Sequence, residues 1–318
     1  NSTALYADGD LAVNGGAVTA LGGKTSSADC AFSLGVQLSE GHSLSVSGGT
    51  LTGIGGESYD TEDPNDVRES FSEGIDIYRG NVTISGGKLL AETVPDMMNK
   101  GLSFGLRTVH GSLFVSDSAV LTAKASQAIV ISGGDIKLSG GKICSYATSD
   151  SAAVSVTRDD YNGIGNANIE ISGGEFTCVG GIYMSASTTA GGMGILSVTN
   201  GKLTAGSVYG PDKLIISNGT VISGRINADT VELQSGRLTV REPVYKNEYT
   251  NVLYASYTIY CKDLIVSGGT LDAAWDWGEY TPSVFPPDSY WGYAQPLIKI
   301  LNGTASFGGG TVILDTGC

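Results

Sequence analysis

One short phrase recurs along the whole chain: two apolar residues separated by one other residue, followed by Ser-Gly-Gly or Asn-Gly-Gly. Clear copies occupy 11–16, 44–49, 82–87, 136–141, 169–174 and 264–269. Degenerate copies begin at Leu113, Leu196, Leu214, Val231 and Ala305, which brings the total to eleven units. A period that runs from end to end predicts one structural unit stacked repeatedly on itself.

Each copy has the pattern of a strand, a corner and a second strand. Apolar residues such as Ile136 and Leu138 share one face of an extended strand, while Lys137 between them faces solvent. The glycine pair permits the positive φ that a sharp corner needs. A second short alternation follows the corner, as at 142–143, and points its apolar residue inward again.

A further short strand precedes most units, so each coil of chain is expected to hold three strands. Ile216 and Leu233 lie 17 residues apart, close to the minimum for one three-sided coil, and longer intervals must carry loops. An antiparallel sandwich of hairpins gives no reason for the same inward residues to recur in phase, whereas stacked coils do. The sequence therefore predicts an all-β fold, a single-stranded parallel β-helix (β-solenoid) of about eleven glycine-cornered units.

The repeats leave no obvious boundary, so residues 1–318 are expected to form a single β-solenoid domain with loop insertions near 55–73, 241–256 and 272–295. The composition agrees with this interpretation. The chain contains 47 glycines and 41% hydrophobic residues, but only 16% charged residues. Such a balance is typical of a turn-rich β protein and not of a disordered chain.

The net charge of −14 limits the partners. It repels phosphate backbones and anionic lipids, so nucleic-acid binding and membrane docking are not expected. No apolar run approaches the ~20 residues of a membrane helix, so no transmembrane segment is expected. The chain begins at Asn1 without a Met or a signal segment and is expected to be a mature or trimmed form. Its five cysteines include no CxxC pair, and most are expected to be small buried hydrophobes without a disulfide framework.

A Gly-Asp or Gly-Asn step precedes several units, at 9–10, 80–81 and 134–135. With this step included, the repeat resembles that of the carbohydrate-binding-domain proteins of clostridial and gut bacteria, which are secreted right-handed β-helices of pectate-lyase-like shape. The resemblance covers 4–312. It implies an extracellular or cell-surface, non-catalytic bacterial protein that binds polysaccharide or cell-wall glycan, with calcium in the solenoid. It supplies no binding residue, and its right-handed winding agrees with the general bias of parallel crossovers.

An aromatic segment near the C-terminus is the first candidate site. All three tryptophans of the chain fall within 17 positions, and the candidate residues are Trp275, Trp277, Tyr280, Trp291 and Tyr293. Aromatic rings stack on the apolar C–H face of a sugar, so this segment predicts a carbohydrate-binding platform. The alternative is a cap or a packed loop at the end of the solenoid. The tyrosine-rich stretch 245–260 is expected to pack against this insertion.

The densest acidic run, at 57–69, is the second candidate site. Its carboxylates could supply oxygen ligands for Ca²⁺ from Asp60, Glu62, Asp63 and Asp66. Their spacing matches no EF-hand, so an ordinary solvated loop is the alternative interpretation.

Catalytic motifs are absent from the sequence. The two histidines, His42 and His110, belong to no nucleophile, zinc-protease or phosphate-loop pattern. We therefore expect a protein that binds polysaccharide without cleaving it. The first alternative is a structural or adhesive surface stalk without a small-molecule site. The second is a polysaccharide lyase-like enzyme whose carboxylates are assembled from several coils.

Overall fold

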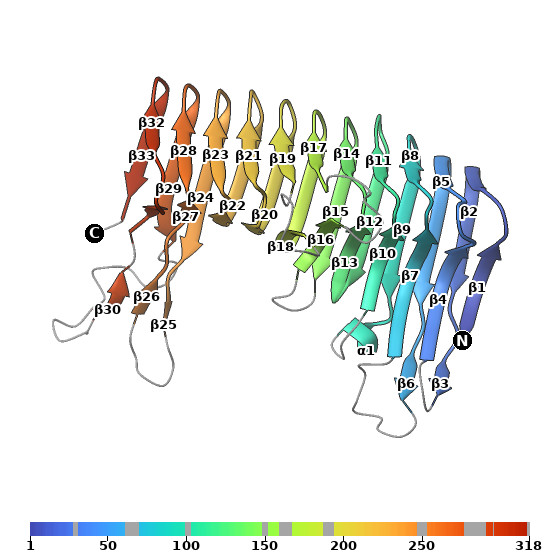
Figure 1. Cartoon of the computed structure of the whole chain (residues 1–318). Coiled ribbons are helices and arrows are strands. Elements are labelled where there is room, and N and C mark those ends of the chain that lie inside the picture. The colour runs from blue at the N-terminus through green and yellow to red at the C-terminus, as the bar shows by residue number, and fades with distance from the viewer. Residues whose placement is uncertain are drawn as a thin grey trace.

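The computed structural model of the chain describes residues 1–27, 31–60, 70–98, 103–147, 152–158, 167–186, 194–246, 253–276, 291–294 and 296–316. Within these residues, 28 strands join one continuous sheet. Each strand pairs in parallel with its counterpart on the next coil, so the predicted parallel β-helix is confirmed (Figure 1). Every coil contributes to three faces, which we call A, B and C.

Each face holds eleven of the described strands, and five long strands bend around a corner to serve two faces. Face A contains β1 (Ser2–Ala7), β4 (Ala31–Leu38), β7 (Ser70–Tyr78), β10 (Ser103–Val109), β13 (Gln127–Ser132), β16 (Ala152–Arg158), the ends of β18 (Glu175–Ala186), β20 (Lys202–Tyr209) and β22 (Thr220–Asn227), then β27 (Ile259–Cys261) and β31 (Ile298–Ile300). Face B contains the starts of β2 (Leu11–Leu21) and β5 (Leu44–Gly55), then β8 (Val82–Ile84), β11 (Leu113–Val115), β14 (Ile136–Leu138), β17 (Ile169–Ile171), β19 (Ile195–Val198), β21 (Lys213–Ile216), β23 (Thr230–Leu233), β28 (Asp263–Val266) and β32 (Ala305–Phe307). Face C contains the ends of β2 and β5, β9 (Lys88–Thr93), β12 (Val120–Ala125), β15 (Lys142–Ala147), the starts of β18, β20 and β22, β24 (Arg237–Pro243), β29 (Thr270–Asp276) and β33 (Thr311–Asp315).

The core consists of apolar columns that run along the solenoid. On face B, Leu113 pairs with Val82 on one side and Ile136 on the other, and Ile136 pairs in turn with Ile169. All four side chains are fully buried. Because the inward residues of successive coils lie directly over one another, the register that the repeat predicted is confirmed.

The glycine corners are tight for two reasons. The second glycine of each pair has a left-handed backbone, with φ of +68° at Gly87 and +70° at Gly141. A Cβ atom on Gly87 would also lie 2.5 Å from the carbonyl oxygen of Gly49 on the preceding coil. A side chain at this position is therefore disfavoured both by the backbone and by the neighbouring coil.

The insertions project away from the glycine corners (Figure 1). They contain α1 (Pro95–Met98), a two-stranded sheet of β3 (Thr25–Ser27) and β6 (Ser58–Asp60), and a three-stranded sheet of β25 (Tyr245–Lys246), β26 (Leu253–Ala255) and β30 (Trp291–Ala294). The pairing of β26 with β30 confirms that the tyrosine-rich stretch packs against the aromatic insertion.

The last coil of the described chain leaves its inward side chains uncovered. Phe307, Val312 and Leu314 of β32 and β33 are all exposed, although they occupy core positions of the repeat. The described part of the C-terminal insertion therefore does not cover the final coil.

Cys144, Cys178 and Cys261 are buried free thiols, as expected from the sequence. Burial raises the pKa of Cys178 to about 12 and that of Cys261 to about 11, so both remain protonated at neutral pH. Among the described helices, none has the length and apolarity needed to span a membrane.

Candidate functional site

Trp275 is the candidate sugar-binding residue whose side chain the structure describes. It lies on β29 and is 9% exposed, packed with Val244, Ala255 and Leu297 in a small second core. Its indole N–H donates a hydrogen bond of 2.9 Å to the carbonyl oxygen of Ser256. A ring enclosed in this way holds the insertion together, which is the packing alternative that the sequence left open.

The other candidate residues cannot be assembled into a site from the described part of the chain. Trp291 and Tyr293 lie on β30, where only the backbone is described, and Asp60 likewise ends β6. Five further candidates lie outside the described residues: Trp277, Tyr280, Glu62, Asp63 and Asp66. The aromatic platform and the calcium site both stay predictions.

Face A instead brings together aromatic and charged side chains that lie far apart in the sequence. One outward position of each strand forms a continuous row, which we call the outer column. Its members in chain order are Tyr6, Gln37, Asp76, Arg107, Val130, Ser155, Tyr183, Tyr209, Asn227, Tyr260 and Lys299. Parallel strands lie ~4.8 Å apart, so the column extends over roughly 50 Å. Charged residues and a pocket lie at its N-terminal end, and tyrosines lie at its C-terminal end.

We call the C-terminal group the tyrosine cluster; it comprises Tyr183, Tyr209, Arg225, Tyr257, Tyr260 and Lys299. Tyr183 stacks on Tyr209 across one coil, with 5.0 Å between ring centroids. Tyr257 and Tyr260 form a second aromatic pair at 4.9 Å. Tyr183 is 38% exposed, and its neighbour on the preceding coil is the small Ser155, so no bulky side chain of the column crowds it from that side.

Arg225 joins the two tyrosine pairs, and Lys299 lies beside the second pair. Arg225 donates a hydrogen bond of 3.3 Å from Nη1 to the Tyr209 hydroxyl, and its guanidinium lies 5.5 Å from the Tyr257 ring centroid. Lys299 Nζ lies 5.6 Å from the centroid of Tyr260. Arg225 also pairs with Glu242, whose pKa is raised by burial against the opposing effect of that guanidinium. Aromatic rings and charged hydrogen-bonding groups therefore alternate over neighbouring coils.

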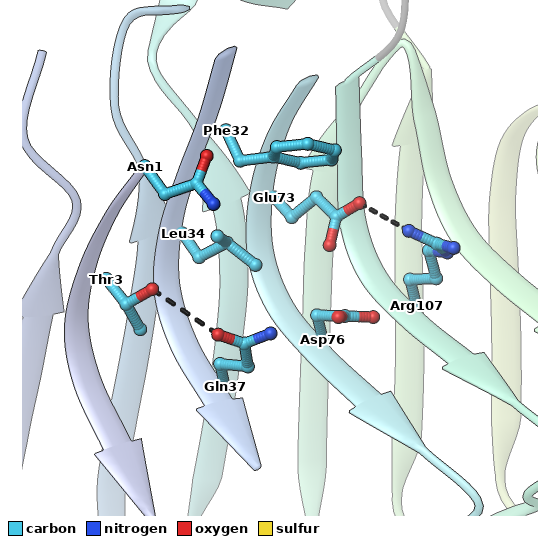
Figure 2. Close-up of a pocket in the computed structure, with 8 residues that line it drawn as sticks. All are labelled: Asn1, Thr3, Phe32, Leu34, Gln37, Glu73, Asp76 and Arg107. Atoms are coloured by element: carbon cyan, nitrogen blue, oxygen red, sulfur yellow. Dashed lines mark hydrogen bonds and ion pairs between the residues drawn. The ribbon is translucent and has the colours of Figure 1, made fainter. Parts of the chain in front are cut away.

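The N-terminal end of face A contains a small pocket of about 190 Å³, which we call the acidic pocket. Figure 2 shows its wall, formed by β1, β4, β7 and β10. The lining includes Thr3, Phe32, Gln37, Glu73, Asp76 and Arg107, with Asn1 and Leu34 beside them. Two acidic residues and one arginine thus come together from strands that begin more than thirty positions apart.

Glu73 is the most unusual residue of the acidic pocket, because it is a carboxyl group that is only 1% exposed. Its Oε1 accepts a hydrogen bond of 2.6 Å from Arg107 Nη1. Burial, reinforced by the charge of Asp76, raises the pKa of Glu73 to about 7 despite the opposing effect of Arg107. Burial also raises the pKa of Asp76. The pocket therefore holds a carboxyl group that titrates near neutral pH.

A stack of phenylalanines borders the acidic pocket. Phe32 and Phe71 lie 5.1 Å apart between ring centroids, and Phe71 and Phe104 lie 6.4 Å apart, with 13° between the planes in each pair. The guanidinium of Arg107 lies 5.5 Å from the Phe104 centroid. This end of face A therefore repeats the combination found in the tyrosine cluster, stacked rings beside charged hydrogen-bonding groups.

The sequence contains a signal for face A in addition to the Ser-Gly-Gly repeat. Asp76, Tyr209 and Lys299 each follow an inward apolar residue on the short strand that precedes a unit. Aligning those strands on that apolar residue places all three in one column. Glu73 gave no such signal, because its burial depends on the arrangement of β4 and β10 around it.

No cluster of three or more histidine, cysteine, aspartate or glutamate side chains able to hold a metal ion occurs in the part of the chain that the structure describes. Comparisons with models of protein families, with curated proteins and with solved structures found no match. The functional interpretation therefore depends on the geometry of face A.

Proposed function

We propose that this chain binds polysaccharide along face A without cleaving it. One observation carries the proposal: face A bears two groups of stacked aromatic rings, the phenylalanine stack and the tyrosine cluster, on the same side of the solenoid. Both groups adjoin arginine and carboxylate side chains. Sugar rings offer apolar C–H faces to aromatic rings and hydroxyls to charged groups, so this combination suits a glycan.

A polymer is favoured over a small sugar because of the extent of the site. The two aromatic groups are separated along the outer column by Val130 and Ser155, the positions contributed by β13 and β16. A ligand that engages both groups must therefore run along the solenoid axis over several coils. An extended polysaccharide has the required length and repeats its recognition groups.

The resemblance of the repeat to carbohydrate-binding-domain β-helices supports an extracellular or cell-surface location and a bacterial origin. It also supports calcium as an accompanying ion. These parts of the proposal depend on the resemblance, and the aromatic groups support the ligand class.

A glycan array with and without EDTA tests the proposal and the role of calcium together. We expect binding to polysaccharides by the intact chain and loss of binding when Tyr183 and Tyr209 are both replaced by alanine. Tyr146→Ala is the matched control, because Tyr146 is similarly exposed but lies on face C. Equal binding by the double variant and the control would exclude face A as the glycan-binding surface. Glycan binding that is lost only when EDTA is present would show that calcium is required.

A lyase-like activity is the second candidate, and the acidic pocket favours it. A carboxyl group with a pKa of about 7 is suited to proton transfer at neutral pH, and Glu73 lies beside Arg107. Incubation with polygalacturonate, followed by ultraviolet detection of unsaturated products, separates the two functions. The binding proposal predicts no product. Product that disappears in Glu73→Gln would replace it with the enzyme.

A further inference from the structure

We propose that the acidic pocket binds the ammonium group of an amino sugar, such as a glucosamine unit within a polysaccharide. The proposal deepens the proposed function by naming the class of sugar, and it rests on that function for the idea that face A binds glycans.

The second oxygen of Glu73 lacks a hydrogen-bond partner. Oε1 is bound to Arg107, but the buried Oε2 has no partner in the described part of the chain. In Figure 2 this oxygen points toward Asp76 and away from Arg107, inside the pocket. Leaving a buried acceptor unpaired costs ~1–3 kcal/mol, and more for a charged group, so a donor supplied by a ligand would be strongly favoured.

The charges of the pocket favour a cationic donor. The carboxyl groups of Glu73 and Asp76 face one guanidinium, that of Arg107, so the side chains of the pocket carry one excess negative charge when both acids are ionised. An ammonium group presents three N–H donors around a compact positive charge. A uronate carboxylate would meet the two acids unfavourably. Arg107 would in turn repel a metal ion, and two carboxylates alone are too few ligands for calcium.

The wall of the pocket favours a sugar ring as the group that carries the ammonium. Phe32 is an aromatic side of the pocket and the first ring of the phenylalanine stack. A pyranose ring can place its C–H face against Phe32 while its amino group reaches Glu73 and Asp76. The volume of about 190 Å³ is below the ~300 Å³ of typical drug-sized sites, which limits the occupant to one small ring or one group of a larger chain.

Protons compete with the ligand for Glu73. Its pKa of about 7 means that it is largely protonated, and therefore neutral, in mildly acidic solution. The charged side chains that face it are Asp76 on β7 and Arg107 on β10; those that line the pocket from β1 and β4 are uncharged. Selective binding of an ammonium group should consequently weaken as the pH falls below 7.

Isothermal titration of three trisaccharides tests the proposal: β-1,4-linked tri-glucosamine, its N-acetylated counterpart and cellotriose. They share a backbone and differ at C2. We expect the intact chain to bind tri-glucosamine about tenfold more tightly than the other two, and the preference to be lost in Glu73→Gln and in Asp76→Asn. Glu170→Gln, an exposed carboxylate on face B, is the matched control and should retain it. The ligand's amine must stay protonated while Glu73 is ionised, so the preference should be greatest near pH 7 and fall on both sides of it.

Equal affinity for the three trisaccharides, or a preference that survives in both pocket variants or does not change with pH, would overturn the amino-sugar proposal. The proposed function would still stand if long polysaccharides bound in a manner that depended on Tyr183 and Tyr209. Conversely, selective tri-glucosamine binding with no effect of the tyrosines on polysaccharide binding would retain the pocket and overturn the wider site on face A.

Discussion

Tyr183 and Tyr209 stack across adjacent coils with their planes inclined by 29°, and the hydroxyl of Tyr209 accepts a hydrogen bond from Arg225. The pair therefore combines an aromatic surface with a fixed cation. Neither residue is close to the other in sequence, and only the register of β18 and β20 brings them together.

The ring and the hydroxyl of Tyr209 should contribute differently to polysaccharide binding. Tyr209→Ala removes the aromatic surface and is expected to lower affinity about tenfold, because one aromatic contact contributes ~1 kcal/mol beyond its buried area. Tyr209→Phe keeps the ring and loses only the hydroxyl that accepts from Arg225, so its affinity should stay within about threefold of the parent. Affinity electrophoresis in polysaccharide gels measures both. If the phenylalanine variant is as weak as the alanine variant, the hydroxyl, and not stacking, carries recognition.

Glu73 should make the protein less stable as the pH rises. Its pKa is about 7 in the folded chain against an ordinary value of 4.5, so between these values the folded state binds more protons than the unfolded state. Stability therefore falls through this window, by up to about 3 kcal/mol from this group. Urea unfolding of Glu73→Gln at about pH 5 and pH 8 should show a pH dependence smaller by that order. An unchanged dependence, as expected for Glu170→Gln, would contradict the burial argument.

Two glycine corners allow the cost of backbone strain to be measured apart from the cost of a clash with the neighbouring coil. Gly141 has φ of +70°, and a Cβ there would lie 2.3 Å from the carbonyl oxygen of Ala119. Gly16 has φ of +71°, but no heavy atom lies within 4 Å of its Cβ position. Gly16→Ala should cost ~1 kcal/mol from backbone strain alone, and Gly141→Ala ~3 kcal/mol. Thermal unfolding measures both, and equal losses would show that the adjacent coil exerts no constraint.

Trp275 should stabilise the C-terminal insertion and not the solenoid. Trp275→Ala removes the largest side chain of the second core and is expected to destabilise that region by ~3 kcal/mol. Hydrogen exchange should accelerate in β26 and near Val244, while amides of β8 and β11 keep their protection. Faster exchange along the whole solenoid would mean that the insertion folds cooperatively with the coils.

The repeat was sufficient to predict the fold because its information is local. The inward position of Ile136 and the corner at Gly141 follow from the residues next to them, and stacking repeats the same choice in each coil. The sequence also displayed the Gly-Asp and Gly-Asn steps, but not their purpose. In the structure, Asp135 Oδ1 accepts a hydrogen bond from the backbone N–H of Asn168, and Asn81 Oδ1 accepts one from the backbone N–H of Ser112. These side chains link one coil to the next.

The candidate site was harder to predict, because it depends on loop lengths. Asp76 and Arg107 are 31 positions apart, whereas Tyr209 and Asn227 are 18 apart, yet each pair occupies adjacent coils. Insertions of variable length hide this common register. The clustering of the tryptophans in sequence predicted a site, but Trp275 is buried, and the residues that face A presents are dispersed over the whole chain.

In-register stacking fixes the distances between sites along the solenoid axis. The distance between the acidic pocket and the tyrosine cluster can change only in steps of ~4.8 Å. Each coil that is added or deleted between them moves the two sites apart or together by one strand spacing. Removing the winding that contains Val130 would leave the contacts within each site intact and alter only the interval between them. Variation in winding number could therefore tune which polymers bridge the two sites, while each site keeps its own chemistry.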